Sequence, residues 1–226
     1  MKITLVRSMA RSAVFELVNS GCYRAPAPYT VSLDGVPVCE GDTNVFSLYS
    51  LEPGRSYTLA VTLDGVTDTL DFTTAEESFF FDASRCGLVA DGVTDNTAKL
   101  QAALSTCPAG GTVYVPAGRY RTASLFLKSN TTLLLDETLT LASNDYKSYS
   151  IINIKGRENV VVKGGKIVGD VGRHYYVEGT TGEWGMGINI DESRNVTIEN
   201  MTITLCTGDG IVNVCAEVFS TDFIIE

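Results

Sequence analysis

The apolar residues of this chain follow two different arrangements, and each predicts its own kind of structure. Up to about residue 76, apolar and polar residues alternate in short runs, at residues 13–18, 29–33, 45–48, 51–59 and 69–74. Alternation with a period of two is typical of half-buried strands. Asp34 with Gly35, and Asp64 with Gly65, are strong hairpin-turn pairs between such runs. This part therefore predicts a small antiparallel β-sandwich.

The rest of the chain contains one helical segment followed by short apolar runs. Four apolar residues recur at helical spacing, namely Ala98, Leu100, Ala103 and Leu104. Asp95 or Asn96 would cap the first turn, and Pro108 would end the helix. Apolar runs follow without a second helix, which disfavours an α/β domain, where helices and strands alternate. We expect domains at residues 1–76 and 77–226, a linker at 75–78, and one helix near 96–106.

An internal repeat lies in the second domain. Residues 157–167 match residues 193–203 at an offset of 36, and a third copy begins at Ser220. A repeated strand pattern indicates a solenoid, in which each coil buries its inward side chains by stacking on its neighbours. The excess over a normal coil lies in residues 169–183, which are rich in glycine and polar residues. Because the pattern runs on to Glu226 without a cap, we expect an N-terminal fragment of a longer protein.

Residues 81–144 carry a family resemblance. They combine a glycine-rich turn, the amphipathic helix, a strand ending in Val-Pro-Ala-Gly at 115–118, and short apolar strands. This order resembles the opening of the right-handed parallel β-helix in the pectin-lyase-like superfamily, and in particular the polygalacturonases of glycoside hydrolase family 28. Residues 51–59 resemble the tyrosine-corner strand of fibronectin type III domains. The resemblance implies an all-β chain: a fibronectin type III-like sandwich, then a right-handed parallel β-helix with a short N-terminal capping helix.

Charge and composition narrow the partners. The formal net charge is −10, whereas nucleic-acid binding needs a basic surface. Residues 147–194 hold seven Lys or Arg against six Asp or Glu, so this region is locally neutral. Arg7 and Arg11 interrupt any signal-peptide core, and no apolar run reaches transmembrane length. We expect no nucleic-acid or membrane partner, a cytoplasmic location and reduced thiols on the six cysteines.

The resemblance to family 28 implies catalysis by carboxylates. An inverting glycosidase needs two carboxyl groups about 6.5–9.5 Å apart across the scissile bond. The family patterns are Asn-Thr-Asp-Gly, Asp-Asp, Gly-His-Gly and Arg-Ile-Lys, and Asp209, within Gly-Asp-Gly-Ile, matches the first or the second of them. In the first register, the remaining groups lie beyond Glu226. In the second, Gly185 or Met186 replaces the first aspartate, and the catalytic set is broken.

Strand alternation assigns a direction to Asp209. If Val212 and Val214 point inward, Asp209 and Asn213 point outward, which makes Asp209 the candidate catalytic residue and Asn213 a sugar contact. A turn aspartate between two glycines explains Asp209 equally well.

Three further substrate-binding candidates lie in or beside the loop at residues 169–184, which we expect to border the substrate groove. Arg173 could pair with a uronate carboxylate, and Trp184 could stack on a sugar ring. His174 is the one histidine of the chain. An exposed histidine and a tryptophan packed under the loop are the plainer alternatives.

The predicted function is that of a polysaccharide-degrading glycoside hydrolase, polygalacturonase-like and inverting, acting on pectic oligosaccharides or another acidic polysaccharide. One alternative is a non-catalytic carbohydrate-binding β-helix, as in tailspike or adhesin modules. Another is a pectate-lyase-type enzyme, although Asp191 with Glu192 is too small a cluster for the Ca²⁺ that such lyases need. We expect no metal and no cofactor, and little or no hydrolase activity from these 226 residues alone.

Overall fold

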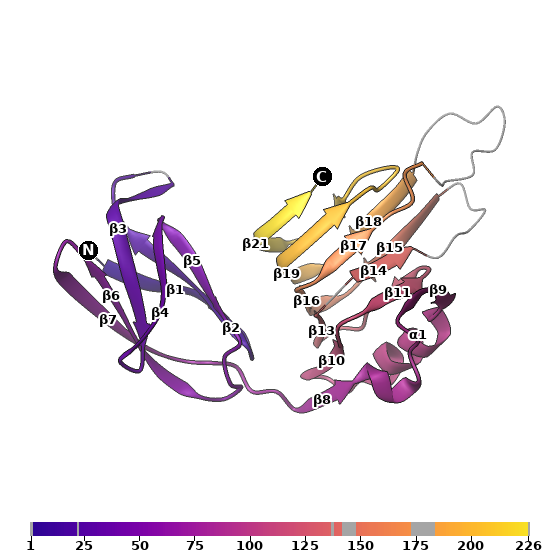
Figure 1. Ribbon diagram of the computed structural model, residues 1–226, viewed down its shortest axis with the longest axis horizontal. Coiled ribbons are helices and arrows are strands. Elements are labelled where there is room, and N and C mark those ends of the chain that lie inside the picture. Colours follow the sequence, from indigo (N-terminus) through magenta and orange to yellow (C-terminus); the bar gives the residue numbers. More distant parts are fainter. Residues whose placement is uncertain (1, 22, 137, 142–147, 173–183, 226) are drawn as a thin grey trace. The chain divides into compact units, whose positions relative to one another are not determined.

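The structure is a computed structural model that describes residues 2–21, 23–136, 138–141, 148–172 and 184–225, and it is almost entirely β (Figure 1). The side chains of residues 138–141 and 219–225 are not described. The chain divides into two compact units, Met1–Glu77 and Ser78–Glu226. No helix within the described residues is long and apolar enough to cross a membrane.

The first unit consists of two antiparallel sheets around one core. The three-stranded sheet has the order β1 (Lys2–Ser8), β2 (Ser12–Val18), β5 (Val45–Tyr49). The four-stranded sheet has the order β4 (Val36–Thr43), β3 (Arg24–Leu33), β6 (Ser56–Leu63), β7 (Val66–Thr73). Asp34 and Asp64 adopt φ values of 52° and 50° in the turns that close two hairpins. The hairpins predicted at these two pairs are therefore confirmed.

The two residues at the boundary between the units, Glu77 and Ser78, form hydrogen bonds within their own units. Arg11 donates two hydrogen bonds to the Glu77 carboxylate, at 3.0 and 2.6 Å. Ser78 donates its backbone N–H to Gly110 O (3.0 Å) and its hydroxyl to Ala109 O (2.8 Å). In the expected linker at 75–78, Glu77 is therefore hydrogen-bonded to the first unit and Ser78 to the second.

The second unit is a stack of parallel coils, which confirms the predicted parallel β-helix. Its long sheet has the order β8-β10-β13-β16-β19-β17-β14-β11-β9, with β21 beside β19; its short sheet has the order β12-β15-β18-β20. The long-sheet strands are β8 (Phe79–Asp82), β9 (Asp91–Asp95), β10 (Gly111–Val115), β11 (Arg119–Thr122), β13 (Thr131–Leu135), β14 (Thr138–Leu141), β16 (Glu158–Lys163), β17 (Lys166–Val168), β19 (Arg194–Thr204) and β21 (Val218–Ile225). The short-sheet strands are β12 (Leu125–Phe126), β15 (Ser148–Lys155), β18 (Trp184–Asp191) and β20 (Ile211–Val214).

The described residues contain one α-helix, α1 (Thr97–Thr106), which lies between β9 and β10, as the periodicity predicts; a 3₁₀ turn, η1 (Ala83–Cys86), lies between β8 and β9. Asp95 Oδ1 accepts the Thr97 N–H at 2.8 Å and so caps the first turn. The Asn96 side chain instead bonds the backbone of Val89. Leu100 and Leu104 are buried and belong to the core of the coils.

Strand register confirms the 36-residue repeat and corrects the alignment of the third copy at Ser220. Val160 pairs with Val196, so the structural offset equals the 36-residue repeat. The next coil is shorter, because Val196 pairs with Val218. Ser220 therefore lies opposite Ile198, whereas a third copy beginning at Ser220 would align it with Ser193. The expected third repeat is a strand of the stack, but in a different register.

An asparagine ladder connects three coils at the beginning of long-sheet strands β13, β16 and β19. Asn159 donates to Asn130 Oδ1 at 2.7 Å, and Asn195 donates to Asn159 Oδ1 at 2.6 Å. All three residues have left-handed backbones, with φ of 60°, 55° and 52° for Asn130, Asn159 and Asn195. Asparagine tolerates this conformation better than most residues, so the same residue type recurs at the same turn.

Candidate functional site

The outward face of the short sheet follows from its inner columns. Ile152 and Ile188 are fully buried and lie in register with Ile211, and the next inner column is Ile154, Ile190 and Asn213. The predicted directions in β20 are therefore wrong. Asn213 shares the inner register and is exposed on the last strand of this sheet, while Val212 and Val214 lie in the outer register. Stacking on β18 decides the direction of these side chains, not their own hydrophobicity.

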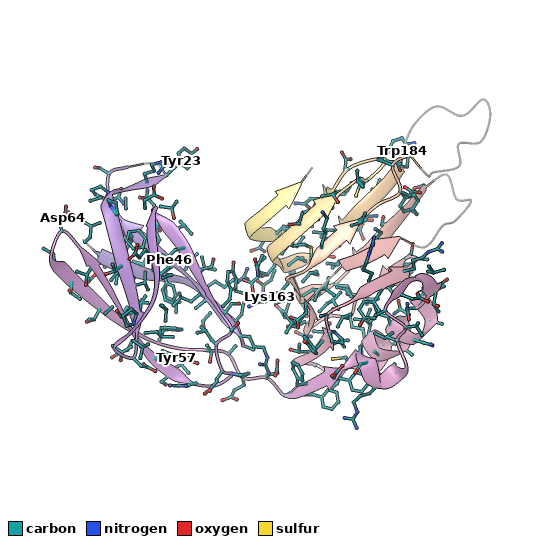
Figure 2. The ribbon with its side chains drawn as sticks, in the orientation of Figure 1. Tyr23, Phe46, Tyr57, Asp64, Lys163 and Trp184 are labelled. Atoms are coloured by element: carbon teal, nitrogen blue, oxygen red, sulfur yellow. The ribbon has the colours of Figure 1, made fainter. Side chains whose placement is uncertain are left out.

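Two glycines show which residues at the beginning of β18 face the interior. A Cβ atom on Gly185 would lie 2.2 Å from Tyr149 Oη, and one on Gly187 would lie 2.7 Å from the buried Ile203. Both positions face the interior, so Trp184 and Met186 face outward. The Trp184 side chain is 51% exposed and stands at the start of β18 (Figure 2).

Asp209 lies in a bulge beside Met186. Gly208 donates its N–H to Gly185 O (2.8 Å), and Gly187 donates its N–H to Asp209 O (3.2 Å). Two residues, Gly208 and Asp209, thus stand opposite Met186 alone. The Asp209 side chain is exposed. Bulges redirect side chains and recur next to active sites. The structure therefore brings Trp184, at the start of β18, and Asp209, just before β20, to the same end of the short sheet.

A second carboxylate on this face, Asp191, lies far from Asp209. Arg173 and His174 lie outside the described residues. Asp191 lies in register with Lys155 and Val214, at the other end of the outer face. Five residues of extended strand separate Asp191 from Met186, which is about 16 Å. Asp191 and Asp209 are therefore too far apart to act as an inverting pair.

Sequence reasoning missed several side chains of this face. Phe126 is 52% exposed and heads the outer column that continues through Asn153 and Asn189, although Asn153 itself is only 6% exposed. Lys155 is exposed at the end of β15. The sequence of residues 151–155, Ile-Ile-Asn-Ile-Lys, could have predicted these side chains. Asn153 and Lys155 are two residues apart and flanked by isoleucine, so they lie on the same face of a strand.

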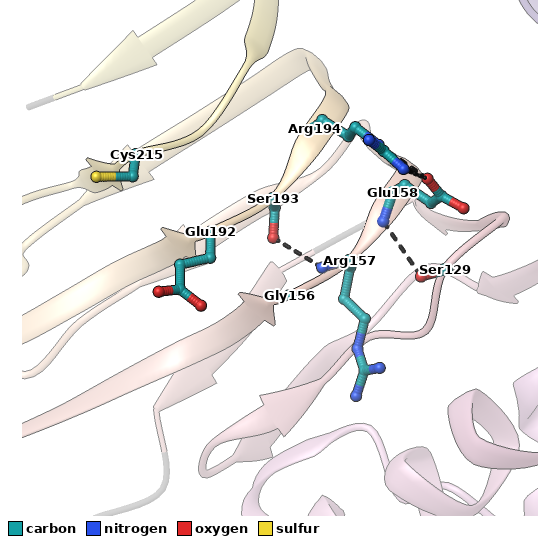
Figure 3. Close-up of a pocket in the computed structure, with 8 residues that line it drawn as sticks. All are labelled: Ser129, Gly156, Arg157, Glu158, Glu192, Ser193, Arg194 and Cys215. Atoms are coloured by element: carbon teal, nitrogen blue, oxygen red, sulfur yellow. Dashed lines mark hydrogen bonds and ion pairs between the residues drawn. The ribbon is translucent and has the colours of Figure 1, made fainter.

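A polar groove of about 500 Å³ follows the opposite end of the short sheet (Figure 3). It is lined by the turns after its strands, at Ser129, Gly156, Arg157, Glu158, Glu192, Ser193, Arg194 and Cys215. Ser193 Oγ accepts the Arg157 N–H at 3.0 Å, and Arg194 pairs with Glu158 at 2.7 Å. The Arg157 and Glu192 side chains are exposed. Asp209, Trp184 and Asn213 do not line this groove, and no metal-binding cluster occurs among the described residues.

Comparison with known proteins identifies relatives of parts of the chain. Residues 80–143 match the family described as rhamnogalacturonase A/epimerase, pectate lyase-like. The chain is 31% identical over 155 residues to the uncharacterized protein YclG of Bacillus subtilis (strain 168), which covers 59% of the chain and 26% of YclG. It is 34% identical over 118 residues to the exo-poly-α-D-galacturonosidase of Dickeya chrysanthemi, covering 46% of the chain and 20% of that enzyme. The chain thus spans about a quarter or less of the length of these relatives.

The fold has a counterpart among solved structures. The family 28 exopolygalacturonase of Yersinia enterocolitica superposes on 99% of the chain and 58% of its own length, with a TM-score of 0.71 and 17% identity. This similarity supports the β-helix architecture.

Proposed function

We propose that the chain is part of a glycoside hydrolase that cleaves galacturonate-containing polysaccharides, and that the outer face of the short sheet is its substrate surface. The observation that carries the proposal is the exposed Asp209, in a bulge beside Met186, at the same end of the short sheet as the half-exposed Trp184. The similarity to an exo-poly-α-D-galacturonosidase supports the substrate class.

In this proposal Asp209 is the general acid or the general base of an inverting reaction. It either protonates the leaving glycosidic oxygen or activates the attacking water. Its partner carboxylate must stand about 6.5–9.5 Å away, and Asp191 is too distant. We propose that the partner comes from outside the described residues.

The outer face offers groups suited to an acidic sugar. Trp184 provides an apolar ring surface for stacking on a pyranose. Lys155, exposed on the same face, provides a cation for a uronate carboxylate. Arg173 and His174 are proposed to border this face as further contacts. The first unit is proposed to be fibronectin type III-like and non-catalytic; its strand order and the Glu52 N–H to Tyr57 Oη bond (2.8 Å) support that assignment.

Trp184 makes substrate binding directly measurable, because it is the one tryptophan of the chain. We expect trigalacturonate to shift or quench its fluorescence in a saturable way. A neutral trisaccharide such as maltotriose serves as the control and should leave the emission unchanged. Equal responses to both sugars, or no response to either, would contradict an acidic-sugar surface at Trp184.

Catalysis is tested with Asp209→Asn in the longer protein. We expect turnover of polygalacturonate to fall by at least about a hundredfold, the scale for losing a general acid or base. The free energy of unfolding should change by less than about 0.5 kcal/mol, because the side chain is exposed. Near-normal turnover would remove Asp209 from catalysis.

A carbohydrate-binding module without catalysis is the second candidate. It is favoured by the wide separation of Asp191 and Asp209 on this face. A fluorescence response to trigalacturonate, with no release of reducing ends by the longer protein, would select it over the hydrolase.

A further inference from the structure

Three buried polar side chains meet on the inner side of the short sheet, behind the bulge that carries Asp209. Tyr149 belongs to β15, Asp170 follows β17, and Thr207 immediately precedes the bulge. They are 6%, 6% and 4% exposed. The Tyr149 hydroxyl donates to Asp170 Oδ1, and Tyr149 Oη lies 3.2 Å from Thr207 Oγ1. One cluster thus joins three segments of the stack that are separated in sequence.

The direction of these bonds follows from the groups involved. Because the Tyr149 proton is donated to the Asp170 carboxylate, Tyr149 Oη remains as the acceptor for the Thr207 hydroxyl. Burial, and then the bond to Asp170, raise the pKa of Tyr149 well above its usual value of 10. The phenol therefore keeps its proton through the neutral range. Buried polar groups are costly unless such bonds satisfy them, so each member depends on the others.

Gly185 makes room for this cluster. A Cβ atom there would lie 2.1 Å from Thr207 Oγ1 and 2.2 Å from Tyr149 Oη. With no side chain in the way, Thr207 packs directly against the backbone of β18. The Gly185 carbonyl also accepts the N–H of Gly208, the first residue of the bulge. The backbone that leads into Asp209 is thereby connected to the buried cluster.

We propose that Tyr149, Asp170 and Thr207 are positioning residues that hold the bulge and so direct the Asp209 carboxylate outward. They are buried and touch no substrate; they act through the backbone at residues 207–210. The functional side of this inference rests on the proposed function, because it requires that Asp209 acts on a ligand. That the cluster holds the backbone at residues 207–210 is inferred from the geometry alone.

Local hydrogen exchange tests the structural side. Tyr149→Phe removes one hydroxyl and leaves the ring. We expect the amide hydrogens of Gly208 and Gly187, which are bonded across the bulge, to exchange at least tenfold faster. The Gly164 amide, bonded to Glu199 O at 3.0 Å in the long sheet, is the internal reference and should keep its rate. Unchanged exchange at Gly208 and Gly187 would overturn the proposal, as would equal acceleration at Gly164.

Matched variants separate the cluster from a general loss of packing. Tyr120→Phe is the control, because Tyr120 is equally buried (3% exposed) and its hydroxyl bonds Ala117 O at 3.3 Å. It should leave the Gly208 and Gly187 rates unchanged. Thr207→Val should reproduce Tyr149→Phe, and Thr207→Ser, which keeps the hydroxyl, should restore slow exchange. If Tyr149→Phe does not fold, the two Thr207 variants decide the question.

The ligand side has its own readout. Trigalacturonate titrated against Trp184 fluorescence should bind the Tyr149→Phe variant at least fivefold more weakly than the wild type, and the Tyr120→Phe variant equally well. No binding by the wild type would refute the proposed function and leave the exchange result to stand by itself. Wild-type affinity in a variant with fast exchange at Gly208 would overturn the positioning role.

Discussion

Lys163 and Glu199 form an ion pair that is almost entirely removed from solvent. Their Nζ and Oε1 atoms are 3.1 Å apart, and the side chains are 9% and 0% exposed. The two residues are 36 positions apart in sequence but directly opposite each other on β16 and β19. Removing two charges from water costs free energy, which their mutual attraction offsets. Loss of one member would therefore leave the other charge buried without that compensation.

The first prediction follows from that dependence. Lys163→Met leaves the Glu199 carboxylate buried without its cation, and should lower the free energy of unfolding by about 3–5 kcal/mol. The double variant Lys163→Met with Glu199→Leu should recover most of that loss, because no charge is then left uncompensated. Urea unfolding of the three proteins gives both numbers. A single variant as stable as the wild type would contradict the prediction.

The second prediction concerns the centre of the asparagine ladder. Asn159→Ala removes two hydrogen bonds, each worth about 1 kcal/mol, and places alanine in a left-handed backbone at a cost of about 1 kcal/mol. We expect a loss of about 2–3 kcal/mol in unfolding free energy. Asn159→Gly also breaks the bonds but accepts the left-handed backbone, so it should be the milder change. If alanine is tolerated better than glycine, the backbone explanation is wrong.

The third prediction is a pH dependence at Asp91. Hydrogen bonds from the Thr94 N–H and hydroxyl, and from the Val93 N–H, lower the pKa of Asp91 to about 2 from its usual 3.8. The folded state therefore favours the carboxylate. The resulting stability is present above about pH 4 and is lost as the pH falls through 2.

Asp91→Asn has no such titration. Between pH 4 and 2, the midpoint of urea unfolding should fall less steeply in this variant than in the wild type. Above pH 5 the two midpoints should differ by a constant amount. Identical slopes between pH 4 and 2 would show that Asp91 does not contribute to acid sensitivity.

The fourth prediction separates two cysteines by reactivity. Burial, and then the charge of Asp170, raise the pKa of the Cys206 thiol to about 11, whereas Cys215 is exposed in a turn. Since the thiolate is the nucleophile, iodoacetamide at pH 8 should alkylate Cys215 well before Cys206. Peptide mass spectrometry follows each site, and the urea-unfolded chain should label both at similar rates. Preferential labelling of Cys206 in the folded chain would refute the prediction.

Much of the architecture could be predicted from local sequence. The single helix, the two hairpins and the 36-residue repeat each depend on interactions between near neighbours or on a repeat that preserves register. The third repeat was misaligned because Ser220 matches Ser193 in residue type, while its register depends on the length of the intervening turn. A sequence pattern contains no information on how many residues that turn consumes.

The site was harder to predict for a related reason. Hydrophobicity put Val212 and Val214 inside, yet β20 takes its phase from β18, so Asn213 occupies the inner column. Asp209 lies in a bulge that depends on hydrogen bonds to Gly185 and Gly187, which are more than twenty residues away. The groove at the turns escaped prediction altogether, because its lining residues come from four different coils.

The sequence separation between paired strands affects how the chain folds while it is being synthesised. Successive strands of the long sheet pair at separations between 19 residues, from Arg119 to Thr138, and 36 residues, from Val160 to Val196. Each coil therefore needs only the coil before it as a template. At synthesis rates of about 5–20 residues per second, a new coil becomes available about every 1–7 s. While the chain is being made, the newest coil is therefore always the exposed one.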